Sequence, residues 1–487
     1  MDLMSCILYG LPKIHKTNIP LRPILSAINS HNFKLAKCLI PWVTPFTSNS
    51  HTINNFYNFK EWLLKIENVH QHFMASFDIT SLYTNIPTSD AINILLDRIF
   101  AEQDLYHGLN KKEFGQLLNA AAKDTYFIFN NELFFQKNSL AVGSPLSAIL
   151  ANIYLSHYEI QWLDKCPESF KPSQYKRYMD DTFLLFKEQK QVKPFLDFLN
   201  KQLPNIKFTS EIETEGSLPF LDLLITKNNL QINTSIYRKK TNTSLGTNFF
   251  SHIPPLYKLN AVKVLIYRAY HLSSSYLALN AEFDYLGRFF MKNNFNLDTI
   301  HQLQNNFLNK IYHPNASSIT VPKQIIYLKL PYYEQIFHKL KRNLLFVLQR
   351  NYPQIDFRLV FYNNFSIKNF CNHKDSTPKS LRSGIVYEFT CGNCSVSYIG
   401  STSRQLHARF SEHKGLSFRS NLPLNNPPYS SIYNHCHSKK HNLDFNCFKI
   451  LNNNNQPDSL RILESLAIKQ FKPQLNADSG PYQLLAV

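Results

Sequence analysis

Three aspartates have the chemistry and spacing of a divalent-cation site. Asp78 follows the apolar run HFMASF, and Asp180 and Asp181 lie side by side in YMDDTF about one hundred residues later. A pair of carboxylates about 4 Å apart repels by on the order of 4 kcal/mol at an effective dielectric near 20. Divalent ions bound through carboxylates relieve such repulsion. Two such ions can activate a hydroxyl nucleophile and stabilise a departing phosphate. The acids therefore predict a cation site wherever the fold brings them together.

A second set of residues has the spacing of zinc ligands. Cys391 and Cys394 form C-x2-C, and His435 and His441 form H-x5-H about forty residues later. Two thiolates and two imidazoles suit tetrahedral Zn²⁺. The long spacing between the two pairs leaves Cys436 and His437 open as competing ligands. We expect the site to stabilise a small domain with a thin core, as structural zinc does.

A third set of candidate functional residues lies in the same part of the sequence as the predicted zinc ligands. Arg409 and His413 are four residues apart and so share one face of a predicted helix. Tyr387 and Tyr398 bracket a short hairpin-like stretch that holds Cys391 and Cys394. Further on, Glu464 lies on a predicted helix and Asn476 follows Pro473. Each residue alone is unremarkable, and only their order along the chain is informative.

The elements around the three aspartates read as an α+β fold. Residues 72–80 predict a buried strand, and 176–186 a hairpin with the paired acids at its turn. Residues 146–163 have helical apolar spacing, and Pro145 just before them fits a helix start. Residues 218–240 predict another hairpin with its turn at Asn228-Asn229.

The chain is too long for one core, since single cores rarely exceed about 250–300 residues. Its 487 residues divide by composition into four segments. We expect a mixed segment at 1–245, a helical segment at 246–370 with helices near 259–274 and 333–352, a linker at 371–383 and a compact unit at 384–487.

The composition favours a nucleic-acid-binding protein. The net charge is +18, with 52 Lys and Arg against 34 Asp and Glu, and such a surplus suits a polyanionic partner. No run reaches the roughly 18 apolar residues of a membrane span. The eight cysteines are too few for a disulfide scaffold in a chain of this length.

Residues 9–240 resemble a reverse transcriptase, in the order of their motifs. The motifs are YGLPKIHK (9–16), LRPILSAINS (21–30), FDITSLYTNIP (77–87), AVGSPLSAILANIYL (141–155), YMDD (178–181) and GSLPFLDLLI (216–225). Their wording is similar to that of Penelope-like retroelements, a family related to telomerase reverse transcriptases. The resemblance implies a right-hand-like polymerase with fingers, an antiparallel palm sheet and a helical thumb.

That resemblance assigns roles to individual residues. It implies that Asp78, Asp180 and Asp181 bind Mg²⁺ or Mn²⁺. Lys13, Lys16 and Arg22 would hold the incoming triphosphate, because Lys supplies a point charge and Arg a bidentate fork. Tyr83 would block a ribose 2′-hydroxyl, and Gly143 and Ser144 would border the nucleotide.

One departure from the family concerns the start of the sequence. Met1 falls only eight residues before the first fingers motif, where members of the family carry a sizeable upstream region. An N-terminally truncated, catalytically inactive nucleic-acid-binding remnant is therefore an alternative. A telomerase-like terminal reverse transcriptase is another, although a nuclease unit argues against it because chromosome ends already offer a 3′-hydroxyl.

Residues 383–478 resemble the GIY-YIG endonucleases, a family with a small sheet flanked by helices that cuts one DNA strand. The resemblance implies that Tyr387 helps to deprotonate water, with Tyr398 and His413 nearby, and that Arg409 stabilises charge on the phosphate. Glu464 would hold one divalent ion and Asn476 would orient its neighbours. Gly384 stands one place earlier than the family pattern has it. Penelope-like endonuclease domains also carry a CCHH cluster, which favours Zn²⁺ on Cys391, Cys394, His435 and His441.

Together the two resemblances imply a retroelement protein. Its endonuclease would nick DNA, and its polymerase would copy an RNA template from the exposed 3′-hydroxyl. The implied partners are the RNA template, the DNA target and primer, and dNTPs, with no membrane. The implied location is nuclear, and self-association stays open.

Overall fold

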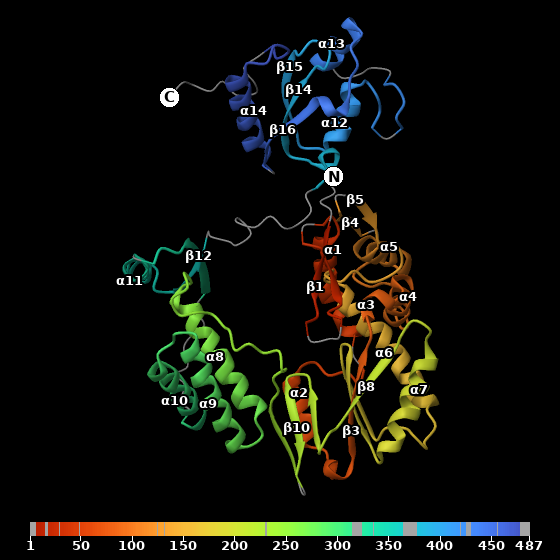
Figure 1. Ribbon diagram of the computed structural model, residues 1–487, viewed down its shortest axis with the longest axis vertical. Coiled ribbons are helices and arrows are strands. Elements are labelled where there is room, and N and C mark those ends of the chain that lie inside the picture. The colour runs from red at the N-terminus through yellow and green to blue at the C-terminus, as the bar shows by residue number, and fades with distance from the viewer. Residues whose placement is uncertain are drawn as a thin grey trace.

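The computed structural model describes most of the chain. The described residues are 6–14, 18–28, 30–47, 49–123, 125–130, 132–228, 231–313, 324–334, 336–363, 377–418, 420–424, 430–454 and 456–477. In this part of the chain, no helix combines the length and apolar character needed to cross a membrane. The strands and helices mix throughout, as an α+β fold requires (Figure 1).

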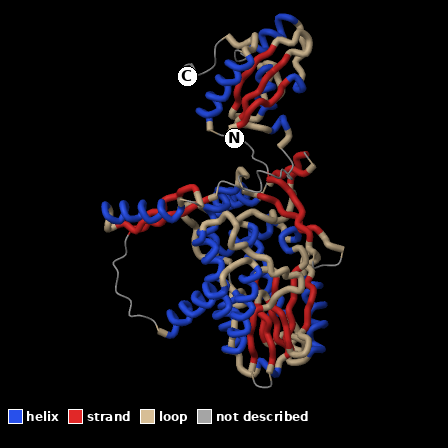
Figure 2. The backbone as a smooth tube through the Cα atoms, turned by 60° about the vertical axis from the view of Figure 1, so that its left-hand side comes forward, coloured by secondary structure: helices blue, strands red, loops and turns tan. Residues whose placement is uncertain are grey.

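A central antiparallel sheet has the strand order β6-β7-β3-β8. Its strands are β3 (Phe73–Ile79), β6 (Gln174–Tyr178), β7 (Asp181–Phe186) and β8 (Phe208–Ile212). Figure 2 shows these strands side by side with helices around them. The predicted strand at 72–80 and the predicted hairpin at 176–186 are both present, as β3 and as β6–β7.

Both faces of this sheet are covered, which explains the continuous apolar run in β7. Successive side chains of a strand point to opposite faces. Leu184 and Phe186 therefore pack into one core, and Phe183 and Leu185 into another. The first core includes α3 (Leu82–Asn85), α4 (Thr88–Ile99), α5 (Lys111–Ala122), α6 (Ser147–Lys165) and α7 (Val192–Gln202). The second includes α2 (Phe56–Leu64), β9 (Ser217–Phe220) and β10 (Leu223–Lys227).

The remaining elements of the N-terminal half form two further sheets. One has the order β2-β1-β4-β5, from β1 (Cys6–Pro12), β2 (Leu21–Ser26), β4 (Tyr126–Phe129) and β5 (Glu132–Phe135), with α1 (Phe33–Val43) following β2. The other has the order β11-β10-β9, where β11 is Ile232–Ile236. The predicted hairpin at 218–240 is present as β10–β11, and Asn229 of its predicted turn lies outside the described residues.

Gly143 is required by its packing against β2. Its φ is +124°, and a Cβ there would lie 2.1 Å from the carbonyl oxygen of Leu25. The neighbouring Val142 carbonyl accepts a hydrogen bond from the Leu25 N–H at 2.9 Å. The absent side chain thus lets the segment before α6 lie directly on the backbone of the β2 strand.

The next segment is helical at first, in α8 (Pro255–Leu272), α9 (Tyr276–Lys292) and α10 (Leu297–Tyr312). It then departs from the helical expectation for 246–370. The strands β12 (Gln324–Pro331) and β13 (Ile355–Tyr362) pair in parallel and are joined through α11 (Phe337–Asn351). Parallel strands need such a crossover. The alternating apolar residues of β12 and β13 indicated strands. The prediction that the whole segment is helical is therefore wrong for these two elements.

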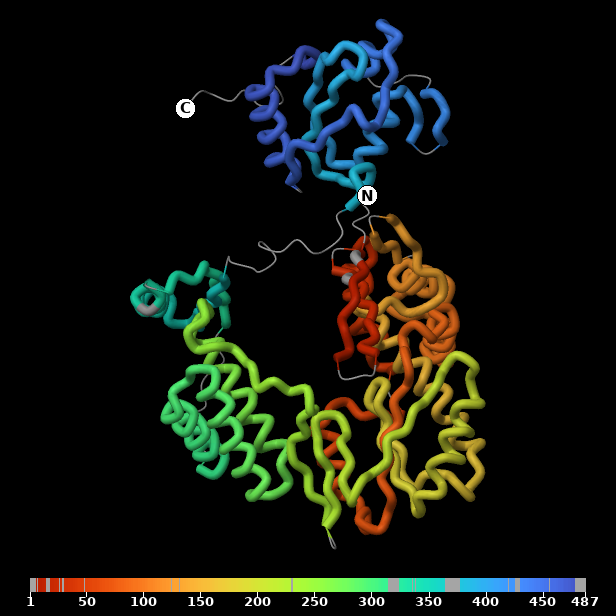
Figure 3. Tube along the Cα trace, viewed as in Figure 1, coloured from red at the N-terminus to blue at the C-terminus, as the bar shows by residue number. Residues whose placement is uncertain are grey.

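The C-terminal unit is a three-stranded antiparallel sheet of order β15-β14-β16, flanked by helices. Its elements are β14 (Ile385–Thr390), β15 (Ser397–Thr402), α12 (Leu406–His413), α13 (Ser431–Lys439), β16 (Phe448–Asn453) and α14 (Pro457–Phe471). Figure 3 shows this unit in blue beyond the rest of the chain. Most of the predicted linker at 371–383 lies outside the described residues, which resume at 377.

Candidate catalytic sites

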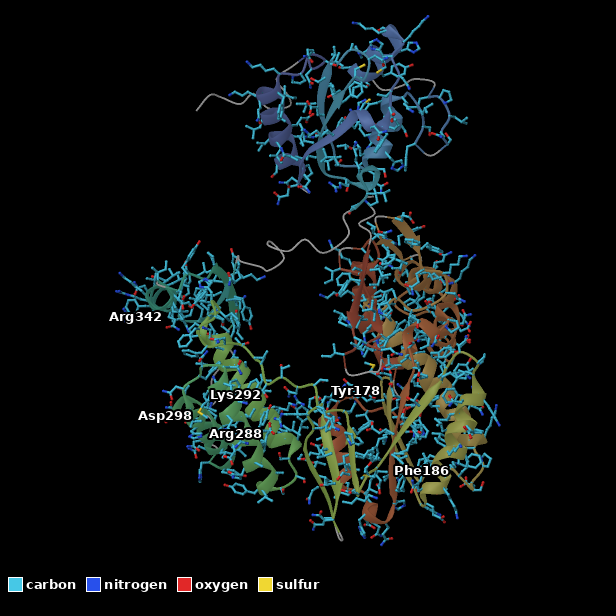
Figure 4. The ribbon with its side chains drawn as sticks, viewed as in Figure 1. Tyr178, Phe186, Arg288, Lys292, Asp298 and Arg342 are labelled. Atoms are coloured by element: carbon cyan, nitrogen blue, oxygen red, sulfur yellow. The ribbon has the colours of Figure 1, made fainter. Side chains whose placement is uncertain are left out.

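The three aspartates meet at one end of the central sheet. Asp78 in β3 lies opposite Asp181, the first residue of β7, and Asp180 occupies the turn between β6 and β7. The turn is tight because Tyr178 pairs directly with Asp181, and Met179 has a φ of 55°. Figure 4 shows Tyr178 near this turn and Phe186 at the far end of β7. Strand register therefore gathers acids that are a hundred residues apart in sequence.

The electrostatics of Asp181 reflect this gathering. Burial, followed by the negative charges of Asp180 and Asp78, raises the pKa of Asp181 to about 6, and Lys239 partly opposes the shift. A divalent cation would lower this pKa again by stabilising the ionised form. The donor set of three carboxylates suits hard cations such as Mg²⁺. Lys239, in the segment after β11, is a neighbour that the sequence motifs did not single out.

Two of the predicted nucleotide-binding residues are Tyr83 and Ser144. Tyr83 lies near the acids, and Ser144 lies directly before α6. Burial raises the pKa of Tyr83, and the charge of Asp180 adds to the shift, so the phenol and that carboxylate are near each other. The Tyr83 carbonyl accepts a hydrogen bond from the Leu140 N–H at 3.0 Å. Ser144 forms the turn that leads into α6, with its carbonyl 3.2 Å from the Ser147 nitrogen. Their contacts with a nucleotide stay a prediction.

The predicted triphosphate-binding residues lie on the β1–β2 hairpin. The Lys13 N–H donates to the Pro20 carbonyl at 2.9 Å, and Arg22 pairs with Leu11 across the hairpin. Arg22 is exposed and Lys13 is half-buried. Lys16 lies outside the described residues. The hairpin thus carries both cations, Arg22 within β2 and Lys13 directly after β1.

A second constellation lies in the C-terminal unit, around Tyr387. The Tyr387 hydroxyl on β14 lies 2.8 Å from His413 Nε2, and Arg409 Nε donates to it at 3.2 Å. Arg409 also donates to Glu412 at 2.9 Å. Figure 1 shows that α12, which carries Arg409 and His413, lies across the sheet from α14. The helix spacing seen in the sequence therefore brings both side chains to one phenol.

The tyrosine and the histidine are both held in their neutral forms. Burial raises the pKa of Tyr387 well above its usual value, although Arg409 opposes the shift. Burial and the nearby Arg409 charge lower the pKa of His413 to about 3. Since the Arg409 N–H donates to the Tyr387 oxygen, the phenol proton is directed at His413 Nε2, which is then the acceptor.

Ser430 orients His413 and was not predicted from the sequence. Its hydroxyl oxygen lies 2.6 Å from His413 Nδ1 and accepts the Tyr433 N–H at 3.2 Å as the N-cap of α13. Such a contact to the second ring nitrogen fixes the tautomer. The only sequence signal was a serine before a helix, which is common at N-caps and carries no functional meaning alone.

Glu464, Tyr398 and Asn476 lie on or against β15. Ser401 donates to Glu464 at 2.8 Å, and burial raises the pKa of this carboxyl despite that hydrogen bond. Asn476 exchanges two hydrogen bonds with the Ile399 backbone, at 2.9 and 2.8 Å. Tyr398 is half-buried, and its pKa is raised by burial and lowered by Arg409. The side chain and backbone of Ser401 thus hold the Glu464 carboxylate close to the Tyr387 cluster.

The Cys/His cluster is compact enough to hold a metal ion. The ligand atoms of Cys391, Cys394, His435 and His441 all lie within 4.8 Å of one another. Cys391 Sγ is 3.3 Å from His441 Nδ1, and Cys394 Sγ is 3.3 Å from His435 Nε2. Tetrahedral zinc with ordinary bond lengths separates its N and S ligands by roughly 3.3–3.6 Å. The donor set and its spacing therefore fit Zn²⁺.

The competing ligands are less suited to that cluster. Cys436 is buried, and burial together with the neighbouring Cys391, Cys447 and Cys394 raises its thiol pKa to about 11. His437 stacks on Tyr433 instead, with ring centroids 5.4 Å apart. Among the described residues, the geometry groups His435 and His441 with the two cysteines.

Comparison with known families identifies the N-terminal part. Residues 14–213 match the family described as reverse transcriptase (RNA-dependent DNA polymerase), so the chain contains a reverse transcriptase domain. Residues 246–305 match the animal helix-turn-helix domain, and they include α8 and α9. No curated protein matches this chain.

Several solved polymerase structures are similar to the chain. The truncated apo telomerase of Candida tropicalis is 14% identical, with a TM-score of 0.36 over 48% of this chain and 56% of that one. The telomerase of Candida albicans, solved with a fragment of telomeric RNA, is 12% identical, with a TM-score of 0.45 over 66% and 62%. The Sicinivirus RNA-dependent RNA polymerase is 13% identical, with a TM-score of 0.39 over 64% and 69%. The chain thus spans about three fifths of the two telomerases.

The raised pKa of Asp181 predicts a pH-dependent stability. The folded-state pKa of about 6 exceeds the unfolded value of 3.8, so the folded state binds this proton more tightly. The resulting stabilisation is complete below about pH 4 and is lost as pH rises through 6. In metal-free buffer at neutral pH, Asp181→Asn should therefore raise the free energy of unfolding by about 1 kcal/mol, after allowance for solvent screening. Urea denaturation measures this change.

The matched control is Asp197→Asn, because Asp197 is an exposed carboxylate on α7. It should leave the free energy of unfolding unchanged at both pH values. A gain for Asp181→Asn that is equally large at neutral pH and below pH 4 would contradict the electrostatic origin.

Proposed function

We propose that this protein is a Penelope-like retroelement enzyme, which nicks DNA through a GIY-YIG endonuclease unit and copies an RNA template from the exposed 3′-hydroxyl. The observation that carries the polymerase half is the convergence of Asp78, Asp180 and Asp181 within a reverse transcriptase domain. The Tyr387–His413–Arg409 cluster supports the nuclease half. Joining the two activities in one chain raises their effective concentration at one target.

In the polymerase half, the protein's own side chains bind and position. Magnesium ions held by the three aspartates would supply charge neutralisation for phosphoryl transfer. Lys13 and Arg22 would bind the triphosphate by charge-assisted hydrogen bonds. Tyr83, next to Asp180, would lie against the sugar and exclude a 2′-hydroxyl. Catalysis of this kind comes chiefly from positioning and electrostatics.

In the nuclease half, the Tyr387 hydroxyl, held by His413 Nε2 and Arg409 Nε, would accept a hydrogen bond from the attacking water and orient it. Arg409, which already donates to that oxygen, would stabilise the negative charge on the scissile phosphate. Glu464 would hold one divalent cation, and the Ser401 hydroxyl fixes the orientation of that carboxylate. Asn476 would hold β15 and therefore Tyr398 in place.

The charge distribution supports nucleic acid as the partner of both halves. Residues 1–374 hold 40 basic and 27 acidic residues, and residues 375–487 hold 12 and 7. Contacts with phosphate should dominate and make binding strongly salt-dependent. The partners would be an RNA template, a DNA target and primer, and dNTPs, and the site of action would be the nucleus.

Primer extension tests the polymerase half. The full chain with Mg²⁺ and an RNA template should incorporate dNTPs, and Asp180→Asn should reduce the rate at least about 1,000-fold, because metal binding supplies several kcal/mol to the transition state. Asp197→Asn should keep the parental rate. Template binding without incorporation by the parent would instead support the inactive remnant.

Plasmid nicking tests the nuclease half. The full chain with Mg²⁺ should convert supercoiled plasmid to open circles, and Glu464→Gln should slow this at least about 100-fold through loss of the cation ligand. Asp458→Asn, an exposed acid in the first turn of the same helix, should nick normally. Equal nicking by Glu464→Gln and the parent would exclude the assigned role.

Zinc content tests the Cys/His cluster. Elemental analysis of the purified full chain should give about one equivalent of Zn²⁺, and Cys394→Ser should lose most of it, because structural zinc requires all four ligands. Cys38→Ser changes an exposed cysteine on α1 and should retain the metal. A zinc content near zero in the parent would refute the site.

A further inference from the structure

Arg177 is a fully buried arginine next to the turn that carries the paired acids. It lies in β6, two residues before Met179, and its side chain and that of its partner Glu159 on α6 are both 0% exposed. Burying a charge is expensive unless it is paired and hydrogen-bonded. An ion pair in this place therefore needs an explanation that stability alone does not supply.

The Arg177 guanidinium joins three elements. It donates to the Glu159 carboxylate through Nε and, at 3.2 Å, through Nη2. Its Nη1 donates to the Asn152 side chain at 2.8 Å and to the Met179 carbonyl at 2.9 Å. The arginine thus ties helix α6 directly to the turn between β6 and β7.

The Glu159 carboxylate is itself held in place. The Tyr175 hydroxyl donates to it at 2.9 Å, and the Asn49 amide does so at 3.2 Å. The backbone of Arg177 is fixed from the other side, since its N–H donates to the His51 carbonyl at 2.9 Å. These contacts fix the carboxylate and the arginine backbone, so that the planar guanidinium presents its donors in a set direction.

The turn that Arg177 holds is strained. Met179 has a φ of 55°, a conformation that costs a residue with a side chain roughly 1–2 kcal/mol. Strain of this kind persists only where the surrounding structure fixes it. The Met179 carbonyl is held by Arg177, and the Asp180 carbonyl accepts the Ile79 N–H at 3.1 Å. The position of the Asp180 and Asp181 carboxylates therefore depends on these two anchors.

We infer that Arg177, oriented by Glu159, is a positioning residue of the polymerase site that sets where the Asp180 and Asp181 carboxylates bind metal. The inference rests on the proposed polymerase function. Arg177 does not touch the reacting atoms, and it acts through the Met179 carbonyl. A displacement of about 1 Å in such a site can cost about 100-fold in rate.

The test exploits a property of buried ion pairs. Removing one partner leaves an uncompensated charge, whereas replacing both by neutral side chains of similar size is often neutral for stability. The double variant R177M/E159Q removes both charges and keeps an acceptor for Tyr175. It should fold and bind template–primer as the parent does, yet its kcat should fall about 10–100-fold with little change in the KM for dNTP.

The matched control is K227M/E213Q. Lys227 and Glu213 form a partly buried pair, with side chains 13% and 10% exposed, which contacts the start of β3 through the Met74 N–H and not the turn. The control should keep the parental kcat. Arg177→Lys is the second variant: it keeps the charge and cannot reach three acceptors at once, so kcat should also fall.

Mn²⁺ affinity, measured by electron paramagnetic resonance, gives a readout independent of turnover. Both Arg177 variants should bind Mn²⁺ several-fold more weakly than the parent and the control. Parental kcat and Mn²⁺ affinity in R177M/E159Q would overturn the inference and leave the pair a merely structural one. Absence of incorporation by the parent would count against the proposed function instead, and the Mn²⁺ affinities would still decide the role of Arg177.

Discussion

Mutual repulsion among three carboxylates is the constraint on which the larger half of the structure depends. The pairing of β3 with β7 places Asp78 opposite Asp181, and burial together with Asp180 raises the pKa of that carboxyl to about 6. Burial and the neighbouring acids disfavour the ionised form of Asp181, and Lys239 offsets them only in part. The energy that holds this arrangement comes from apolar side chains, because β7 is covered on both faces by separate cores. The cores thus stabilise a register that the charges oppose.

The two candidate sites differ in where their positive charge comes from. At the central sheet, the acids outnumber the cation near them, so divalent ions from solution would complete the proposed site. In the C-terminal unit, Arg409 supplies the cation from within and is paired with Glu412 at 2.9 Å. That arginine also lowers the pKa of His413, which burial has already lowered, and so keeps the imidazole neutral as a hydrogen-bond acceptor. A fixed cation suits the proposed activation of one water, and exchangeable ions suit the proposed nucleotide transfer, which would release pyrophosphate at each step.

The sequence alone was sufficient for features that depend on local periodicity. The strand that carries Asp78 and the hairpin around Asp180 follow from apolar runs and turn chemistry, and the position of Arg409 and His413 on one helix face follows from helical spacing. Features fixed by long-range packing could not be read in this way. Ser430 reaches His413 only because α13 lies beside α12, and Gly143 is demanded by the Leu25 carbonyl, more than a hundred residues earlier. The parallel pair β12–β13 was missed because α11 between its strands dominated the pattern.

The Cys/His cluster and the Tyr387 site belong to one structural unit, because helix α13 contributes to both. Helix α13 begins after Ser430, whose hydroxyl contacts His413 at 2.6 Å, and it carries His435, which lies 3.3 Å from Cys394. A small sheet covered here by two short helices, α12 and α13, has little apolar surface to fix α13 by packing alone. A metal ion that binds His435 to the β14–β15 turn would supply the missing constraint. The helix joins the two sets of residues, so a shift of one displaces the other.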